Sequence, residues 1–141
     1  MRVVEPGSRG ELTHRVREED TAERWANDVP VLATPVLLWL GEVACMRAVE
    51  HALEEGEMTV GAAYDCQHLA PTPAGFEVRV TATVVESDGR RLVFDVEAGD
   101  GADLVFRGTH SRRVVDRARF LARVAAKRAA LEPVDGGRAA R

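Results

Sequence analysis

The sequence has few cysteines, no long apolar run and no excess of basic residues. Its two cysteines, Cys45 and Cys66, are too few for a disulfide scaffold and lack the spacing of a metal site. No run of about eighteen apolar residues is present, so no transmembrane helix is expected. The formal net charge of -4 argues against a nucleic-acid partner. The early polar residues argue against a signal peptide, and the predicted location is the reducing cytoplasm.

The length and composition fit one folded domain. Hydrophobic residues make up 45% of the 141 residues and charged residues 30%, which is typical of a globular protein. A chain of this size can bury roughly two-thirds of its unfolded surface, which is enough for a core. We expect a single domain over residues 1–141, with a frayed tail over residues 132–141.

The strongest predicted helix spans residues 34–53. It begins at Thr34, because threonine can cap a helix and the proline that follows fits the first turn. Its first half is apolar nearly all round, apart from Gly41 and Glu42, as in helices surrounded by protein. Gly56 is expected to end it.

After this helix the hydrophobic period changes from 3.6 to 2, which predicts strands. Short turns between four consecutive strands predict an antiparallel meander, and a looser alternation near the N-terminus predicts one more strand. The predicted strands span residues 10–17, 58–70, 76–84, 92–98 and 103–115. In the third of these, Phe76 is expected to share the inward face with Val78 and every second residue up to Val84.

This order of elements predicts the fold class. One strand, one long buried helix, four antiparallel strands and a basic C-terminal helix over residues 116–131 give an α+β protein. A sheet of about five strands would wrap the central helix, which is the hotdog arrangement. Such a sheet leaves exposed edges and an incompletely covered core, so we expect two copies to pair as a homodimer.

Glu42 is the first candidate for chemistry. A carboxylate among apolar helix residues is costly to bury without a partner. Apolar surroundings can also tune its pKa for a role as general base or nucleophile. In the structural alternative, Glu42 faces solvent or pairs with Arg47 or Arg15.

Three further residues have both a functional and a structural interpretation. His68 is an acid–base candidate or a hydrogen-bonded strand-end residue. Thr34 is a helix cap whose hydroxyl lies at a helix end suited to polarising a carbonyl. Gly61 marks a bulge or a close ligand approach within a strand. Seven residues separate Gly61 from His68, so the two face opposite sides unless a bulge lies between them.

The other histidines, His14, His51 and His110, match no partner pattern. The two cysteines are interpreted as small core residues, and the basic side chains of the C-terminal helix as a solvated face.

Three segments within residues 29–116 carry a combined pattern: VLATPVLLWLGEVACMRAVE, VGAAYDCQHLAPTPAG and FRGTHSRRVV. A threonine is followed eight residues later by a glutamate, and then by a histidine ahead of an A-x-T-P-x-G turn. Together these segments resemble the fluoroacetyl-CoA-thioesterase-like branch of the hotdog acyl-CoA thioesterases.

The resemblance implies a homodimer that hydrolyses acyl-CoA thioesters with no metal or redox cofactor. It assigns catalytic roles to Thr34, Glu42 and His68. It assigns substrate-binding roles to Gly61 and Arg112.

The segment ahead of the threonine departs from this family. Residues 26–33 contain no phenylalanine, Trp25 is the only aromatic residue nearby, and the lid region is shortened. The resemblance therefore extends to thioester hydrolysis but does not decide fluoroacetyl selectivity. Trp39 is expected to reshape the acyl pocket.

The spacing of Thr34 and Glu42 limits the mechanism. Eight residues correspond to about 12 Å of rise in a straight helix, which is too far for a hydrogen bond within one chain. Either the helix begins later than Thr34, or the site combines residues of two copies. We favour the second, with Glu42 of one copy beside Thr34 or His68 of the other.

Three other functions fit the pattern less well. A hotdog protein can bind acyl-CoA or a small hydrophobic ligand without catalysis, because fold alone does not decide function. A hotdog hydratase or dehydratase usually places an aspartate and a histidine close together near the helix, whereas Asp65 and His68 lie in a strand. A purely structural dimerisation module leaves the helix carboxylate unexplained.

Overall fold

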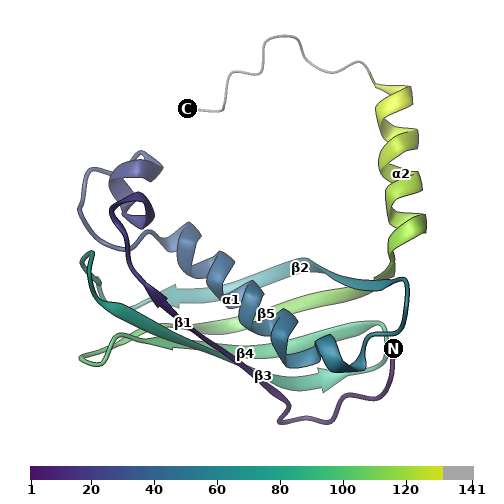
Figure 1. The fold of residues 1–141 in the computed structure, drawn as a ribbon, viewed down its shortest axis with the longest axis horizontal. Helices are drawn as coiled ribbons and strands as arrows, with labels where there is room; N and C mark the ends of the chain where they lie inside the picture. The colour runs from purple at the N-terminus through teal and green to yellow at the C-terminus, as the bar shows by residue number, and fades with distance from the viewer. Residues whose placement is uncertain (132–141) are drawn as a thin grey trace.

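The computed structural model describes residues 1–131, and the tail expected to fray, residues 132–141, lies outside the described residues. The strands are β1 (Arg9–Arg15), β2 (Glu57–His68), β3 (Glu77–Ser87), β4 (Arg91–Gly99) and β5 (Leu104–Asp116), the α-helices are α1 (Thr34–Val49) and α2 (Arg117–Ala130), and the short 3-10 helices are η1 (Glu18–Asp20), η2 (Ala22–Trp25) and η3 (Glu50–Ala52). The strands form one antiparallel sheet in the order β1-β3-β4-β5-β2, and α1 crosses one face of it (Figure 1). The predicted hotdog arrangement is confirmed. The predicted meander of four strands was wrong, because only β3, β4 and β5 follow one another in the sheet, and β2 pairs with β5 at the edge instead of with β3.

The hydrophobic core lies between α1 and the sheet face that the helix crosses. Alternation in β3 and β4 places every second side chain in this layer, as predicted from the period of 2. Phe76, which was expected on the same face, precedes β3 and is 51% exposed, so that expectation was wrong. The buried residues of the two strands are Val78, Val80, Ala82, Val84, Leu92, Phe94, Val96 and Ala98.

Both predicted ends of the central helix need correction. The N-cap residue is Ala33, and Thr34 is the first helical residue, with no cap hydrogen bond from a side chain. At the other end, Glu50 keeps a helical backbone and the chain continues as η3. Gly56, with φ +81°, belongs to the later turn that leads into β2 and does not cap α1. The threonine hydroxyl is therefore available for another partner.

The C-terminal helix forms as predicted, but it lies away from the body. Asp116 caps α2 by accepting a hydrogen bond from the Arg119 backbone N–H at 2.8 Å. None of the residues of α2 is buried, and the helix projects from the end of β5 (Figure 1). Within residues 1–131, no helix is long and apolar enough to span a membrane.

A close backbone approach fixes α1 against β1. Gly10 lies in β1, and a Cβ atom at this position would overlap the Ala44 carbonyl oxygen and the Ala48 backbone nitrogen of α1. Only glycine allows this approach, because the opposing atoms belong to a helix backbone that cannot move aside.

We predict that Gly10→Ala lowers the free energy of unfolding by about 1–3 kcal/mol, as overpacking does elsewhere. Gly99→Ala is the matched control, because a Cβ there would meet Asp103 O at an ordinary 3.5 Å. Urea unfolding of both variants measures the difference. Equal stability of the two variants would contradict the close approach.

Candidate active site

Glu42 lies on α1 and pairs with an arginine of the sheet. Its Oε1 accepts a hydrogen bond from Arg112 Nη1 at 2.9 Å. The Glu42 side chain is 35% exposed, whereas that of Arg112 is only 5% exposed. Neither of the expected structural partners, Arg47 and Arg15, contacts this carboxylate among the described residues. Arg47 instead bonds to the Glu11 carbonyl oxygen.

Besides its bond to Glu42, the Arg112 guanidinium makes hydrogen bonds to residues of the sheet. Its Nε donates to Thr59 Oγ1 at 2.9 Å and its Nη2 to the Thr59 carbonyl oxygen at 3.0 Å. Nη1 also lies 3.1 Å from His110 Nε2. The guanidinium is planar, so these bonds together fix both its position and its plane.

Gly61 leaves the space that the Glu42 carboxylate occupies. It pairs with Arg112 in the β2–β5 register, and a Cβ atom on it would overlap Glu42 Oε1. The register shifts between Gly61 and Ala63, which places a bulge in β2 as the sequence suggested. The structure thus brings Glu42, Gly61 and Arg112 together.

Thr34 and His68 form a second pair at another part of the molecule. Thr34 Oγ1 and His68 Nδ1 share a hydrogen bond of 2.7 Å. The other ring nitrogen, Nε2, is buried and has no hydrogen-bond partner within residues 1–131. Burial lowers the pKa of His68, so the ring is neutral near pH 7. A neutral imidazole with one nitrogen fixed and the other unused is suited to proton transfer.

Two hollows meet at this pair. One of about 320 Å³ is lined by Thr34 and His68 together with Trp25 and Val29. The other, of about 370 Å³, adds Leu69 from the end of β2. Trp25 therefore lines the hollow next to the Thr34–His68 pair.

The two pairs do not meet within one chain. Thr34 begins α1 and Glu42 follows in the same continuous helix, so the separation of about 12 Å holds. The possibility that the helix begins later is excluded. Among the described residues, no hydrogen bond or ion pair joins Glu42 to Thr34 or His68.

Two neutral groups lie near the Glu42 carboxylate, Cys45 on α1 and Tyr64 on β2. Burial raises the pKa of Cys45 to about 12 and also raises the pKa of Tyr64. The Tyr64 hydroxyl donates to the Leu38 carbonyl oxygen at 3.1 Å. Arg112 is thus the residue that supplies positive charge to this carboxylate.

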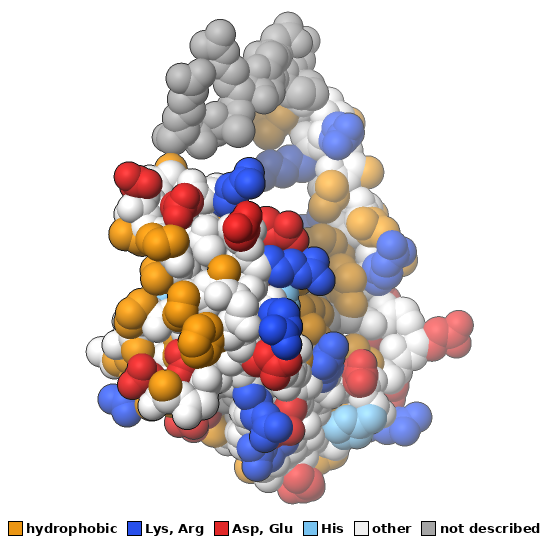
Figure 2. Space-filling view, turned by 60° about the vertical axis from the view of Figure 1, so that its left-hand side comes forward, with side chains coloured by type: hydrophobic (Ala, Val, Ile, Leu, Met, Phe, Trp, Pro, Cys, Tyr) orange, Lys and Arg blue, Asp and Glu red, His pale blue; other side chains and the backbone are white. Residues whose placement is uncertain are grey.

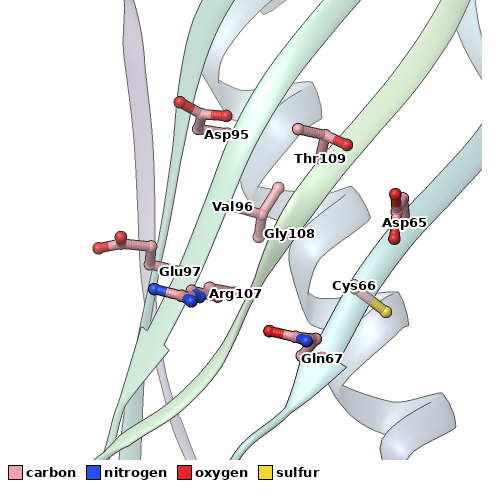
Figure 3. A pocket seen from close by; sticks show the side chains of 9 residues that line it. All are labelled: Asp65, Cys66, Gln67, Asp95, Val96, Glu97, Arg107, Gly108 and Thr109. Carbon is pink, nitrogen blue, oxygen red and sulfur yellow. The ribbon is translucent and has the colours of Figure 1, made fainter.

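A third hollow lies on the outer face of the sheet and contains none of the predicted site residues. It has a volume of about 400 Å³ and lies over β2, β4 and β5, with α1 behind the sheet (Figure 3). Asp65, Asp95 and Glu97 outnumber Arg107 on its rim. Their negative charge would repel the phosphates of a coenzyme, which makes this a poor substrate site.

His110 is the site residue that the sequence did not reveal. It is 2% exposed, and its Nε2 lies 3.6 Å from Glu42 Oε1. The only sequence signal was its position two residues before Arg112, since such residues share one face of a strand. A lone histidine in a strand has no spacing pattern that would have singled it out.

The structure is similar to known thioesterases. A crystal structure from Thermus thermophilus, described as a hypothetical protein and a thioesterase superfamily member, matches with a TM-score of 0.85 and 28% sequence identity, and the match covers 93% of this chain and 100% of that chain. Fold and site together therefore define a thioesterase of the hotdog fold.

Closer similarity is found to one branch of that class. The family model for the fluoroacetyl-CoA-specific thioesterase matches residues 16–118. The fluoroacetyl-CoA thioesterase of Streptantibioticus cattleyicolor is 43% identical over 97 residues, which are 69% of this chain and 70% of the relative. A crystal structure of the fluoroacetyl-CoA thioesterase FlK matches with a TM-score of 0.82 and 36% identity, over 89% of this chain and 98% of that one.

This chain belongs to the fluoroacetyl-CoA-specific thioesterase family, and it is an acyl-CoA thioester hydrolase. The resemblance noted in the sequence is confirmed at the level of the family. Membership also favours the enzyme over the binding-module, hydratase and structural alternatives.

The buried His110 and the half-buried His68 predict a pH-dependent stability. Burial lowers the pKa of His68 and of His110 below the ordinary value of 6.5. Below about pH 6.5 the unfolded chain binds protons that the folded chain does not. The free energy of unfolding is therefore expected to fall as the pH decreases from 7.5 to 5.5.

Urea unfolding at both pH values measures this loss, with His110→Asn as the comparison. The variant lacks one of these two imidazoles, so it should lose less stability between the two pH values than the parent. An equal loss in both proteins would show that His110 takes up its proton in the folded state.

Proposed function

We propose that the chain hydrolyses a small or medium acyl-CoA thioester to the carboxylic acid and coenzyme A at a site that two copies complete. Thr34, Glu42 and His68 would be the catalytic residues, and Gly61 and Arg112 would bind the substrate. The observation that carries the proposal is the buried, unpartnered Nε2 of His68 beside Thr34. A buried polar atom without a partner is costly, and a substrate or a second copy would relieve it.

The reaction needs a nucleophile near the thioester carbonyl. Glu42 either attacks the carbonyl carbon directly or accepts a proton from the water that attacks it. Within the described residues, hydrogen bonds reach only Oε1 of this carboxylate, which leaves Oε2 for that role. Arg112 holds the carboxylate in place by binding the first oxygen.

The leaving group needs a proton. As the carbon–sulfur bond breaks, the electron pair goes to the sulfur of coenzyme A, and His68 passes to that thiolate the proton released by the attacking water, so the ring is neutral before and after the reaction. The oxygen of water ends in the carboxylic acid, so one water is consumed for each thioester. Thr34 fixes the ring through Nδ1 and leaves Nε2 to carry the proton.

A second copy would bring the separated pairs together. β2 lies at the edge of the sheet and has 12 residues, which include Gly61 beside Glu42 and His68 at the end of the strand. An exposed edge of this length tends to pair with another strand. In an antiparallel pair of β2 strands, a two-fold axis between Gly61 and His68 places each Glu42 near the partner's His68.

The exposed apolar surface fits the same arrangement. Hydrophobic side chains gather on the face that Figure 2 brings forward. Around the Thr34–His68 pair, Trp25 is 53% exposed, Leu69 45% and Val29 41%. Apolar patches that rim a pocket mark sites for a ligand or a partner, so we propose a homodimer with the acyl group bound beneath Trp25.

The location follows from the substrate and the thiols. Cys45 and Cys66 are unpaired, and acyl-CoA is the substrate class of this family. We therefore propose a cytoplasmic enzyme.

A thiol-release assay across short, branched, aromatic and halogenated acyl-CoAs tests the function. Release from at least one substrate supports the proposal, and the comparison of fluoroacetyl-CoA with acetyl-CoA measures the selectivity for the fluorinated substrate. Tight binding of one acyl-CoA without any release would replace hydrolysis by binding.

We predict that Glu42→Gln lowers kcat by about 10²–10⁴-fold, because the amide can neither attack nor accept a proton. Coenzyme A binding, measured by calorimetry, should survive. Glu50→Gln is the control, since Glu50 is an exposed glutamate at the end of the same helix and should leave kcat unchanged. Near-normal turnover by Glu42→Gln would remove Glu42 from the mechanism.

We predict that two inactive variants, Glu42→Gln and His68→Ala, regain activity when they are mixed and allowed to exchange subunits. If Glu42 of one copy works with His68 of the other, each mixed dimer has one intact site. Random exchange would then restore about a quarter of the parent activity. Native mass spectrometry confirms that mixed dimers form. Mixed dimers without activity would place the whole site within one chain.

A further inference from the structure

Beyond the proposed catalytic residues, the fold buries a histidine beside the Glu42–Arg112 pair. We propose that His110 is a positioning residue. Its neutral ring holds Arg112 against Glu42 and fixes the bulge in β2 that leaves space for the Glu42 carboxylate. This inference rests on the proposed function, because it concerns the same carboxylate.

The hydrogen-bonding roles of the ring are fixed by its partners. The His110 Nδ1 atom lies 2.9 Å from the Ala63 carbonyl oxygen, and Nε2 lies 3.1 Å from Arg112 Nη1. A carbonyl oxygen only accepts and a guanidinium nitrogen only donates. Nδ1 therefore carries the hydrogen and Nε2 accepts from Arg112, which defines one neutral tautomer.

The Arg112 nitrogen at the centre of this contact has two hydrogens. One points to Glu42 Oε1 at 2.9 Å and the other to His110 Nε2 at 3.1 Å. The distance of 3.6 Å between Nε2 and Oε1 is too long for a hydrogen bond. His110 thus acts on the carboxylate through Arg112 and not directly.

The Nδ1 bond acts on the bulge in β2. The register shift lies between Gly61 and Ala63, and the Ala63 carbonyl is the acceptor of the His110 ring. A bulge frees backbone groups from the ladder, and this side chain satisfies one of them. The same bulge positions Gly61, which faces Glu42 Oε1 without a Cβ atom.

Protonation would undo this arrangement. A second hydrogen on Nε2 would face the N–H of Arg112, and the acceptor that orients Nη1 would be lost. The titratable and charged groups beside the ring are Glu42 on α1, Tyr64 on β2 and Arg112 on β5. Burial is the main cause of the lowered pKa of His110, and it keeps the ring neutral near pH 7.

Three variants separate positioning from packing. His110→Phe keeps a ring against Tyr64, which stacks on His110 at 4.1 Å, but removes both hydrogen bonds. His110→Gln offers an amide oxygen near Nε2 that can accept from Arg112. His110→Asn offers an amide nitrogen near Nδ1 that can donate to Ala63.

We expect His110→Phe to lower kcat by between about 10- and 100-fold with less than a threefold change in KM, because a small displacement of the carboxylate slows chemistry more than binding. His110→Gln should recover most of kcat, and His110→Asn should recover less. Full kcat in His110→Phe would overturn the inference. The inference would also be overturned if the loss of kcat in each of the three variants simply followed its loss of unfolding free energy, with no recovery in His110→Gln.

A measurement without substrate keeps this test separate from the proposed function. Nitrogen NMR of the His110 ring in the parent protein at pH 7.5 should show a protonated Nδ1 and an unprotonated Nε2. A ring protonated at Nε2 would overturn the inference even in an active enzyme. Should the parent release thiol from no acyl-CoA, the proposed function fails, whereas the observed tautomer still decides how His110 holds Arg112.

Discussion

The ion pair between Glu42 and Arg112 is the constraint on which the site depends. Arg112 is almost completely buried, and a buried charge is stable only with a partner and further hydrogen bonds. Glu42 supplies the charge, Thr59 accepts from the far side of the guanidinium, and His110 accepts from the near side. Removing the Glu42 charge would leave Arg112 buried without a counter-charge, so helix and sheet are coupled through this contact.

The position of this pair explains several local features of the sheet. The carboxylate needs room where β2 passes α1, and Gly61 provides it by lacking a side chain. The bulge at Ala62 sets the register that brings Gly61 opposite Arg112. A glycine and a bulge each weaken a strand, but here both make room for the contact between Glu42 and Arg112.

The Thr34–His68 pair obeys a different constraint. Ala33 takes the N-cap position, so the Thr34 hydroxyl does not cap the helix and instead hydrogen-bonds to the imidazole of His68. The continuous helix then keeps this pair about 12 Å from Glu42. Because the two pairs do not meet within one chain and the edge strand β2 carries both His68 and the Gly61 that faces Glu42, we propose that a second copy completes the site.

The sequence by itself determined the α+β class, the central helix, the alternation of β3 and β4 and the family, because these depend on periodicity and on local motifs. It also indicated the bulge near Gly61, since glycine weakens a strand. It misassigned Thr34 as a cap, Gly56 as the helix end and Phe76 as a core residue, because a boundary is decided by contacts that a local pattern does not contain. Only the tertiary structure decided that Glu42 pairs with Arg112 and that His110 lies beneath them. Those residues are far apart along the chain, and folding the sheet around the helix is what brings their side chains together.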